Sequence, residues 1–485
     1  MNPAAATLAP SGQTPRMPAP AARQRLPLVG LFVANAISIM GNVFAIIAIP
    51  WFVLETTGSP TLTGLAAAMN GLPYIVGGVL GGAFVDRVGF RAASIISDLA
   101  SAVGVAVIPL LHTLDLLTFP LLLVFIVVGG LMDSPGNTAR AALLPDLADR
   151  AGVRRERVNA LDQSVMRMAF MLGAPLGGLL LALVGTATGL WLNACSFLVS
   201  ATIIALAIPK VASHQSEARA QAANEATAGV AGDITLRESM RIGIEFLRTT
   251  PLMRALVVQV ALTNMFDAMI SVMYPIYARD TFGSTASLGL MLGASGAGAL
   301  TTALIFGAIG HNLPRRHVYF GAFMLTSVPI VLLSLQPVLL ISAGLLLIRG
   351  FGAGPLNPIL MTVSQERIPI NLRGRVMGVT MSIAWIAMPI GSLLGGVSVS
   401  VLGLRAALVL VGTLSFSTCL LMYLRPVFRD LERRPAPLSF ATMLTPATGT
   451  ASAPTHVHTH PHAPQRQFPE PAHAGRGQRQ GQDYR

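Results

Sequence analysis

The sequence is poor in charged residues. Asp, Glu, Lys and Arg make up 11% of its 485 residues, whereas soluble globular domains carry about 25%. So little charge cannot cover a water-facing surface of this size, which excludes an ordinary soluble protein. Hydrophobic residues make up 53%, and the mean hydropathy is +0.64. Apolar runs of about 20 residues, the length that crosses a bilayer, recur along most of the chain, so the sequence predicts an integral membrane protein.

Cysteines and common enzyme motifs are scarce or missing as well. The two cysteines, Cys195 and Cys419, lie inside apolar runs, which favours packing roles over a disulfide or a metal site. The sequence has no HExxH pair, no nucleophile elbow and no GxxxxGK(S/T) phosphate loop. We therefore expect no enzyme activity, no cofactor, no metal and no direct use of ATP. The apolar run after the N-terminus is too long for a cleavable signal peptide.

Twelve apolar runs follow one another, and the joints between them are often only a few residues long. Short joints place consecutive helices antiparallel, so the sequence predicts an all-α membrane protein with twelve transmembrane helices. Gly and Pro interrupt many runs, which membrane helices tolerate because their neighbours satisfy the freed backbone groups. The runs are 28–53, 61–85, 91–111, 118–140, 159–184, 188–209, 254–279, 286–309, 317–335, 337–360, 374–399 and 402–424.

Arginine is concentrated at alternate joints. Twelve arginines lie in the joints after runs 2, 4, 8 and 10, among them Arg140, whereas the other joints hold almost none. The positive-inside rule then places both termini in the cytoplasm, and we expect a multi-pass protein of the cell (inner) membrane. The net charge of +12 is explained by this topology and by lipid headgroups, so we expect no nucleic-acid partner.

An internal repeat divides the runs into two sets of six. A first shift along the chain places Arg91 on Arg316, and a second, slightly shorter shift places Gly173 on Gly391 within a further set of Gly, Ser and Arg matches. Because six is even, both halves have the same orientation in the membrane. The predicted parts are a disordered cytoplasmic N-terminus (1–27), an N-terminal half (28–209), a cytoplasmic linker (210–253), a C-terminal half (254–425) and a disordered tail (426–485).

The linker and the tail have distinct compositions. The linker begins polar and rich in Ala, which indicates disorder. It ends in a segment with Leu236, Met240, Ile244 and Leu247 at helical spacing, which predicts an amphipathic helix on the cytoplasmic membrane face. The tail is rich in Pro, Ala, His and Gln, and its alternating histidines at 456–462 can bind metal. We interpret them as low-complexity sequence.

A charged motif lies between the second and third runs. The pattern G-x-x-x-D-R-x-G-x-R at Gly82, Asp86, Arg87, Gly89 and Arg91 resembles the signature loop of the major facilitator superfamily, and the similarity extends over about 28–425. In that family the loop latches the cytoplasmic sides of the two halves together in the outward-facing state, and a charged cluster at a helix end can bias such an equilibrium. The alternative is a charged turn that only fixes topology.

Other segments are similar to the drug, macrolide and siderophore exporters of this superfamily. The joints at 135–147, 157–161 and 373–378 resemble theirs. The set Gly173, Pro175, Gly177 and Gly178 is similar to the helix 5 motif of antiporters, with its Pro one place later than usual; close helix packing is the other interpretation. The resemblance implies proton-coupled efflux of amphiphilic drugs by alternating access. Export of a siderophore-like metabolite and nutrient uptake are the alternatives, and a receptor or scaffold would not need buried ionisable groups in both halves.

Ionisable residues inside membranes are costly and usually functional. Asp267 lies about thirteen residues into the seventh run, close to the bilayer midplane at 1.5 Å per residue, and the repeat maps it onto Asn42. We interpret Asp267 as the proton-coupling acid, with Arg349 as its partner and Asp133 as the next candidate. The alternative is a static Asp267–Arg349 ion pair, and an ion pair between Asp133 and Arg167 is a further prediction.

The family resemblance also implies a substrate cavity. Helices 1, 4, 7 and 10 line it in the superfamily, so their polar residues are the candidates for contacting a substrate. We expect a small-molecule substrate, protons or another coupling ion, membrane lipids as surroundings and a monomeric protein. The candidate cavity residues are Asn35, Asn42, Gln259, Asn264 and Asn357.

Overall fold

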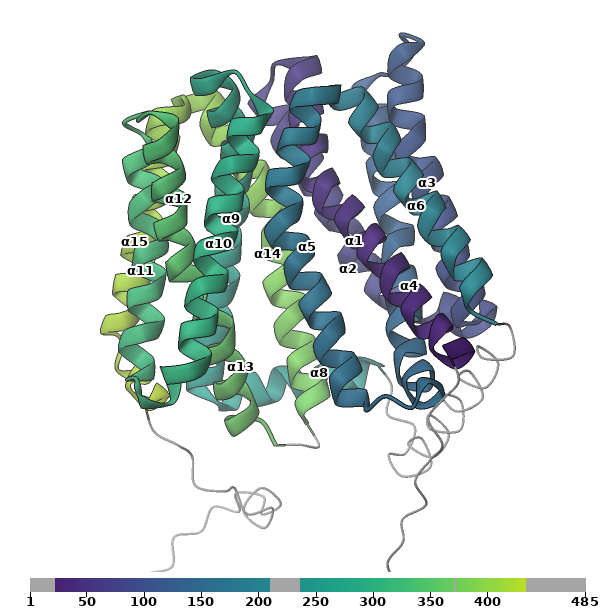
Figure 1. Ribbon diagram of the computed structural model, residues 1–485. Helices are drawn as coiled ribbons and strands as arrows, with labels where there is room; N and C mark the ends of the chain where they lie inside the picture. The colour runs from purple at the N-terminus through teal and green to yellow at the C-terminus, as the bar shows by residue number, and fades with distance from the viewer. Residues whose placement is uncertain (1–21, 210–235, 370–371, 433–485) are drawn as a thin grey trace, which may run out of the picture. The chain divides into compact units, whose positions relative to one another are not determined.

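The computed structural model describes residues 22–209, 236–369 and 372–432, and within these residues it is helical and contains no strand (Figure 1). For some residues inside helices, among them Asp86 and Arg167, the backbone is described but the side chain is not. Most of the predicted N-terminal segment, the first part of the linker and nearly all of the predicted tail, with its histidine run, lie outside the described residues.

Long helices joined by short turns make up the described chain. We call α1–α6 the first helix set and α9–α15 the second helix set. The helices are α1 Ala22–Thr57, α2 Pro60–Val88, α3 Phe90–Thr113, α4 Phe119–Ala151, α5 Arg155–Val184, α6 Thr186–Ala207, α8 Leu236–Thr249, α9 Pro251–Phe282, α10 Thr285–Ile309, α11 Arg315–Leu333, α12 Leu339–Ala353, α13 Leu356–Arg367, α14 Arg373–Leu402 and α15 Leu404–Leu424, with 3-10 turns η1 Gly310–Asn312 and η2 Pro426–Leu431.

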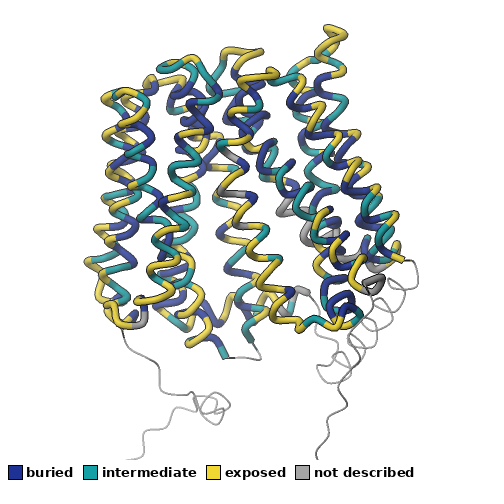
Figure 2. Tube along the Cα trace, in the orientation of Figure 1, coloured by how far each residue is buried: buried dark blue, intermediate teal, exposed yellow. Residues whose placement is uncertain are grey.

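Many of these helices suit a membrane. In the described residues, 10 stretches are long and apolar enough to cross one. Large apolar side chains lie exposed on the outer faces, as Leu206 and Leu340 do at 83% and 81% exposure, and Figure 2 shows exposed residues along the outside of the helices. A protein in water rarely leaves so much apolar surface uncovered. The predicted all-helical, multi-pass membrane protein is confirmed, and the number twelve stays a prediction.

The sequence repeat reappears in the backbone. Gly58 and Gly283, which the first shift relates, have φ angles of 65° and 64°, and Gly185 and Gly403, which the second shift relates, both have φ of 79°. Each of these glycines ends a helix at a tight reversal, where any L side chain would be strained. The two shifts found in the sequence therefore relate turns of the same geometry.

Two runs differ most from their predicted bounds. The run predicted at 337–360 is two helices, since α12 ends at Ala353 and α13 begins at Leu356. The pair Gly354 and Pro355 lies between them, where Gly weakens a helix and Pro has no N–H to donate. The run predicted to end at 140 continues as α4 to Ala151. Arg140 therefore lies inside a helix and not in a cytoplasmic joint, as its charge had suggested.

Glycines bring the two helix sets into contact. A Cβ atom on Gly64 of α2 would lie 2.6 Å from the Ser392 carbonyl oxygen of α14, and one on Gly178 of α5 would lie 2.5 Å from the Cα of Gly289 on α10. Such distances leave no room for a side chain, so the backbones approach each other directly. Small residues allow this close approach in membrane helices. The first and second helix sets are thus joined by α2 on α14 and α5 on α10.

Helix α8 packs partly on the protein. Phe246 and Leu247 are buried in a cluster with residues of α9 and α14, and Gly243 lies against the Arg375 backbone. Met240 and Ile244 remain exposed. The predicted amphipathic helix exists, but one of its apolar faces covers protein, because Phe246 and Leu247 complete the core beneath it.

Candidate functional site

A cavity of about 520 Å³ lies between the two helix sets. Helices α1–α4 and α6 form one side of it, and α9, α10 and α14 form the other. Most of its walls are apolar or aromatic, including Phe125, Phe197 and Trp385. A few polar groups in an apolar wall are typical of small-molecule sites. The polar lining residues are Asn42, Asn70, Ser101, Asp133, Asn193, Ser271, Tyr274 and Ser392.

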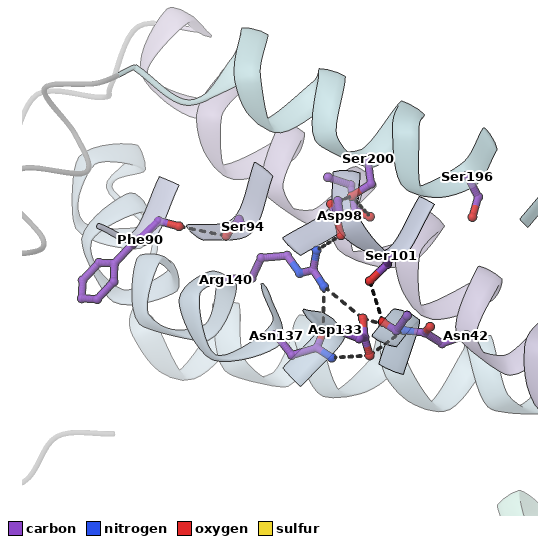
Figure 3. A network of polar contacts seen from close by, with 12 residues as sticks. Asn42, Phe90, Ser94, Asp98, Ser101, Asp133, Asn137, Arg140, Ser196 and Ser200 are labelled. Carbon is purple, nitrogen blue, oxygen red and sulfur yellow. Dashed lines mark hydrogen bonds and ion pairs between the residues drawn. The ribbon is translucent and has the colours of Figure 1, made fainter. Parts of the chain in front are cut away.

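Asp133 connects this cavity to a buried polar network. The residue is 3% exposed. Its carboxylate accepts hydrogen bonds from Asn42 Nδ2, at 3.1 Å to each oxygen, and from Asn137 Nδ2 at 3.1 Å. Figure 3 shows these contacts beside Arg140. Asn42 and Asp133 also line the cavity, so the network can be reached from it.

Arg140 lies at the centre of the network. Its Nη1 is 2.8 Å from Asp98 Oδ1, its Nη2 donates to Asn137 Oδ1 at 2.9 Å, and Nη2 lies 4.0 Å from Asp133 Oδ1. Ser200 of α6 donates to the other Asp98 oxygen at 2.7 Å. One guanidinium thus lies between two buried carboxylates. Charges this far from water are stable only when paired and hydrogen-bonded.

Sequence reasoning missed the role of Arg140 because hydropathy ended the fourth run there. A signal was present, since Asp133, Asn137 and Arg140 are spaced at i, i+4 and i+7, which puts three polar side chains on one face of a helix. The sequence predicts an ion pair of Asp133 with Arg167 instead. The Arg167 side chain lies outside the described residues, so that pair stays a prediction.

The second helix set contains a related pair. Arg349 Nη2 of α12 lies 2.5 Å from Asp267 Oδ1 of α9, so the two residues that the sequence predicts to be partners are in contact. The Asp267 side chain is 57% exposed and that of Arg349 is 14% exposed. The Arg349 guanidinium carbon also lies 6.0 Å from the ring of Tyr274, which lines the cavity. The repeat relates Asp267 to Asn42. Asn42 donates to Asp133 of α4, and Asp267 accepts from Arg349 of α12 in the same way.

The other predicted cavity residues lie elsewhere. Asn35 donates to Asp162 at 3.0 Å beside a small cavity of about 100 Å³. Gln259 is fully buried and contacts Cys419 Sγ, Asn264 donates to the Ala384 carbonyl, and Asn357 is exposed on α13. Of the five predicted substrate contacts, Asn42 lines the main cavity, where it lies next to Asp133.

The signature loop is a tight turn that one half-buried arginine ties to a neighbouring helix. Gly89 has a φ of 87° and lets α3 follow α2 directly. Arg91 donates to the carbonyls of Ala205, at 2.6 Å, and Ile208, at 2.7 Å, at the C-terminal end of α6, where a cation is favourable. Arg87 is exposed, and Gly82 and the Asp86 side chain lie outside the described contacts. The described part of this loop therefore binds within the first helix set.

Arg316, the repeat partner of Arg91, makes the equivalent contact. Its Nη2 donates to the Tyr423 carbonyl at the C-terminal end of α15. The first shift relates Arg316 to Arg91, and the second shift relates Tyr423 to Ala205. Both helix sets therefore contain the same contact, which we call the clamp: an arginine at the start of α3 or α11 donates to a carbonyl at the C-terminal end of α6 or α15.

We expect Arg91→Ala to slow transport and to leave substrate affinity nearly unchanged. It removes two charge-assisted hydrogen bonds, each worth about 1.5–3 kcal/mol in a protein, and loosens α3 from α6 without touching the cavity. Arg25→Ala, at an exposed arginine of α1 outside the signature loop, is the matched control. The transport rate and the binding of substrate to the protein in detergent are measured side by side. Equal losses in both would point to misfolding.

The helix 5 glycines touch two neighbours. A Cβ on Gly173 would lie 2.6 Å from Val43 Cγ1 of α1, and one on Gly177 would lie 3.2 Å from Phe44. Pro175 packs against Gly293 of α10, next to the contact of Gly178 with Gly289. The motif therefore fixes α5 against both α1 and α10, in line with the packing interpretation.

Gly178→Val should separate α5 from α10 and open the cavity at that end. The new side chain has no space against Gly289 and the Thr285 carbonyl, so conformations without this contact are favoured. The readout is labelling of a Leu292→Cys cavity reporter by an impermeant maleimide, in a Cys195→Ser background. Gly321→Val, at a glycine with no neighbour within 4 Å, controls for helix propensity. Equal labelling in both variants would contradict the expectation.

Comparison with known proteins agrees with this architecture. The profile described as Major Facilitator Superfamily matches residues 31–266 and 256–461. The Multidrug efflux pump Tap of Mycolicibacterium fortuitum is 32% identical over 387 residues, which cover 79% of this chain and 91% of that protein. The Enterobactin exporter EntS of Shigella boydii is 25% identical over 353 residues, covering 72% of this chain and 79% of that protein.

A solved structure shares the fold. The nucleoside transporter NupG aligns with a TM-score of 0.63 and 10% identity, over 82% of this chain and 99% of that one. Likeness at this identity shows the arrangement of helices alone. The family profile, by contrast, extends over well more than half of the chain. The chain therefore belongs to the major facilitator superfamily.

Proposed function

We propose that the protein is a secondary transporter that exports amphiphilic drugs or related small molecules across the cell membrane. The cavity between the two helix sets carries this proposal, because its apolar and aromatic walls suit greasy molecules and its few polar groups can orient them. The similarity to multidrug efflux pumps named Tap supports the same activity. Export of a siderophore-like metabolite is the second candidate, supported by the lower similarity to EntS.

Alternating access fits the helix contacts. We propose twelve spans in two six-helix halves, 28–209 and 254–425, with both termini in the cytoplasm. In this topology the glycine contacts of Gly64 and Gly178 lie toward the outer ends of their helices, where Thr61 also donates to Ser400 at 2.8 Å. These contacts would close the cavity on the outer side, and rocking of one half against the other would break them.

Two acid sites support coupling to protons. Asp267 is half exposed beside Arg349, and the buried network holds two carboxylates against the one guanidinium of Arg140. Acids at such positions in membrane proteins often exchange protons. We propose Asp267 as the principal coupling acid and Asp133 as the second, with substrate held next to Asn42.

Transport into inside-out membrane vesicles tests the proposal. An acidic interior should drive accumulation of some members of a panel of dyes, macrolides and siderophores, and a protonophore should abolish it. Vesicles without the protein are the control. Accumulation of siderophores alone would favour the second candidate. If no compound moves in either direction, the export proposal is wrong.

A further inference from the structure

A second cavity, of about 340 Å³, lies between α1, α5 and α6. In Figure 1, α1 passes behind the space between α5 and α6. The cavity walls are nearly all apolar and include Ile37, Met40, Phe44, Leu176, Leu180 and Leu192. No charged side chain lines it among the described residues, so it suits an uncharged apolar group.

The mouth of this cavity faces the outside of the helix bundle. Leu176 on α5 and Leu192 on α6 line it and are 51% and 44% exposed. Leucines exposed on the outer faces of apolar helices in a membrane protein lie toward the acyl chains. The cavity is therefore reached from the bilayer and not from the water on either side.

Asn193 separates this cavity from the main one. It lines both cavities and is 3% exposed. Its Oδ1 lies 3.4 Å from Ser196 Oγ, but its Nδ2 is buried and has no hydrogen-bond partner. A buried donor without an acceptor costs about 1–3 kcal/mol. Because Asn193 lines this cavity, rotation of its amide would bring the N–H to an oxygen of a ligand held there.

We propose that this lateral cavity binds an uncharged amphiphile dissolved in the bilayer, whose carbonyl or ether oxygen accepts a hydrogen bond from Asn193 Nδ2. The inference deepens the proposed function, on which it rests for the idea that the ligand is a transport substrate. The apolar part of the molecule occupies the space beside Met40 and Leu176. Asn193 then holds it at the wall of the main cavity, where export begins.

Protection of engineered cysteines tests binding without any transport. The probe is Nile red, a neutral dye with one carbonyl oxygen, added to the purified protein in lipid nanodiscs. In a Cys195→Ser background, Leu176→Cys reports on the cavity, and Leu179→Cys, on the same helix and 50% exposed but outside the cavity lining, is the matched control. Nile red should slow labelling by a membrane-permeant maleimide at Leu176→Cys and not at Leu179→Cys.

When Asn193→Leu is added, the Nile red concentration that gives half-maximal protection should rise by ~2–10-fold, the effect expected of losing one hydrogen bond. Equal slowing at both cysteines, or at neither, would overturn the proposed site. Protection that survives Asn193→Leu unchanged would overturn the hydrogen bond and leave a plain lipid-chain pocket.

Efflux of two dyes separates this inference from the proposed function. Ala36→Phe, which narrows the cavity, and Asn193→Leu should reduce export of Nile red much more than export of ethidium, a cation that arrives from water. Val33→Phe, on the exposed face of α1 outside the cavity, should change neither. Equal loss for both dyes would contradict the lateral site. If the unmodified protein exports neither dye nor any other compound, the proposed function fails, while cysteine protection still decides whether the site binds.

Discussion

Arg140→Met is expected to lower the free energy of unfolding by about 3–5 kcal/mol, the usual cost of removing one partner from a buried ion pair. Arg140 is 2% exposed and lies between the Asp98 and Asp133 carboxylates. Methionine has a similar length but cannot balance either charge. Thermal unfolding in detergent measures the loss. Arg154→Met, at an exposed residue, should change stability by less than about 0.5 kcal/mol.

A double variant separates the charge from the packing. If uncompensated charge causes the loss, Asp98→Asn in the Arg140→Met background should recover part of the stability, because the isosteric amide still accepts from Ser200 and carries no charge. Arg140→Lys keeps the charge and loses the two-pronged contact to Asp98 and Asn137, so we expect an intermediate value. No recovery in the double variant would assign the effect to packing instead.

Asp267→Asn is expected to abolish accumulation of substrate against its gradient and to preserve exchange. The amide keeps the size of the carboxylate and can still accept a hydrogen bond from Arg349, but it cannot take up and release a proton. Proteoliposomes with an imposed pH gradient measure accumulation, and counterflow without a gradient measures exchange.

Asp280→Asn is the matched control for this experiment. Asp280 lies on the same helix and forms an ion pair with its neighbour Arg279 at 2.9 Å, away from the cavity lining. It should accumulate substrate like the unmodified protein. If Asp267→Asn still concentrates substrate, the coupling acid is another residue, and Asp133→Asn is the next variant. Loss of both accumulation and exchange would indicate that the Asp267–Arg349 pair holds the fold.

Much of the fold could be predicted because membrane helices can be recognised by their composition. The apolar runs, the short joints and the internal repeat all reappear, the last as matched φ angles at Gly58 and Gly283. The pairing of Asp267 with Arg349 was also predicted, because two charged residues at similar depth inside a membrane are stable only when they form an ion pair.

The parts that could not be predicted depend on side-chain direction and on where a helix stops. Hydropathy ended the fourth run at Arg140, although a buried arginine can continue a helix when a carboxylate such as Asp98 of the adjacent α3 pairs with it. Hydropathy also continued the tenth run through Gly354 and Pro355, where α12 ends and α13 begins. Gln259 is a polar residue on a helix expected to line the cavity, but its side chain points toward Cys419. The sequence does not show which face of the helix turns toward the cavity.

The clamps of Arg91 and Arg316 bear on how the chain is made. The Ala205 carbonyl that Arg91 binds is synthesised 114 residues later, at the end of the sixth helix, and Arg316 likewise binds near the end of α15. Each contact therefore forms only when its own helix set has left the ribosome, and it needs nothing from the other set. Since units of a chain fold in order of synthesis, the first helix set can be completed in the bilayer while the second is still being translated. A gene cut between codons 210 and 235 should then yield two polypeptides that reassemble into a working protein.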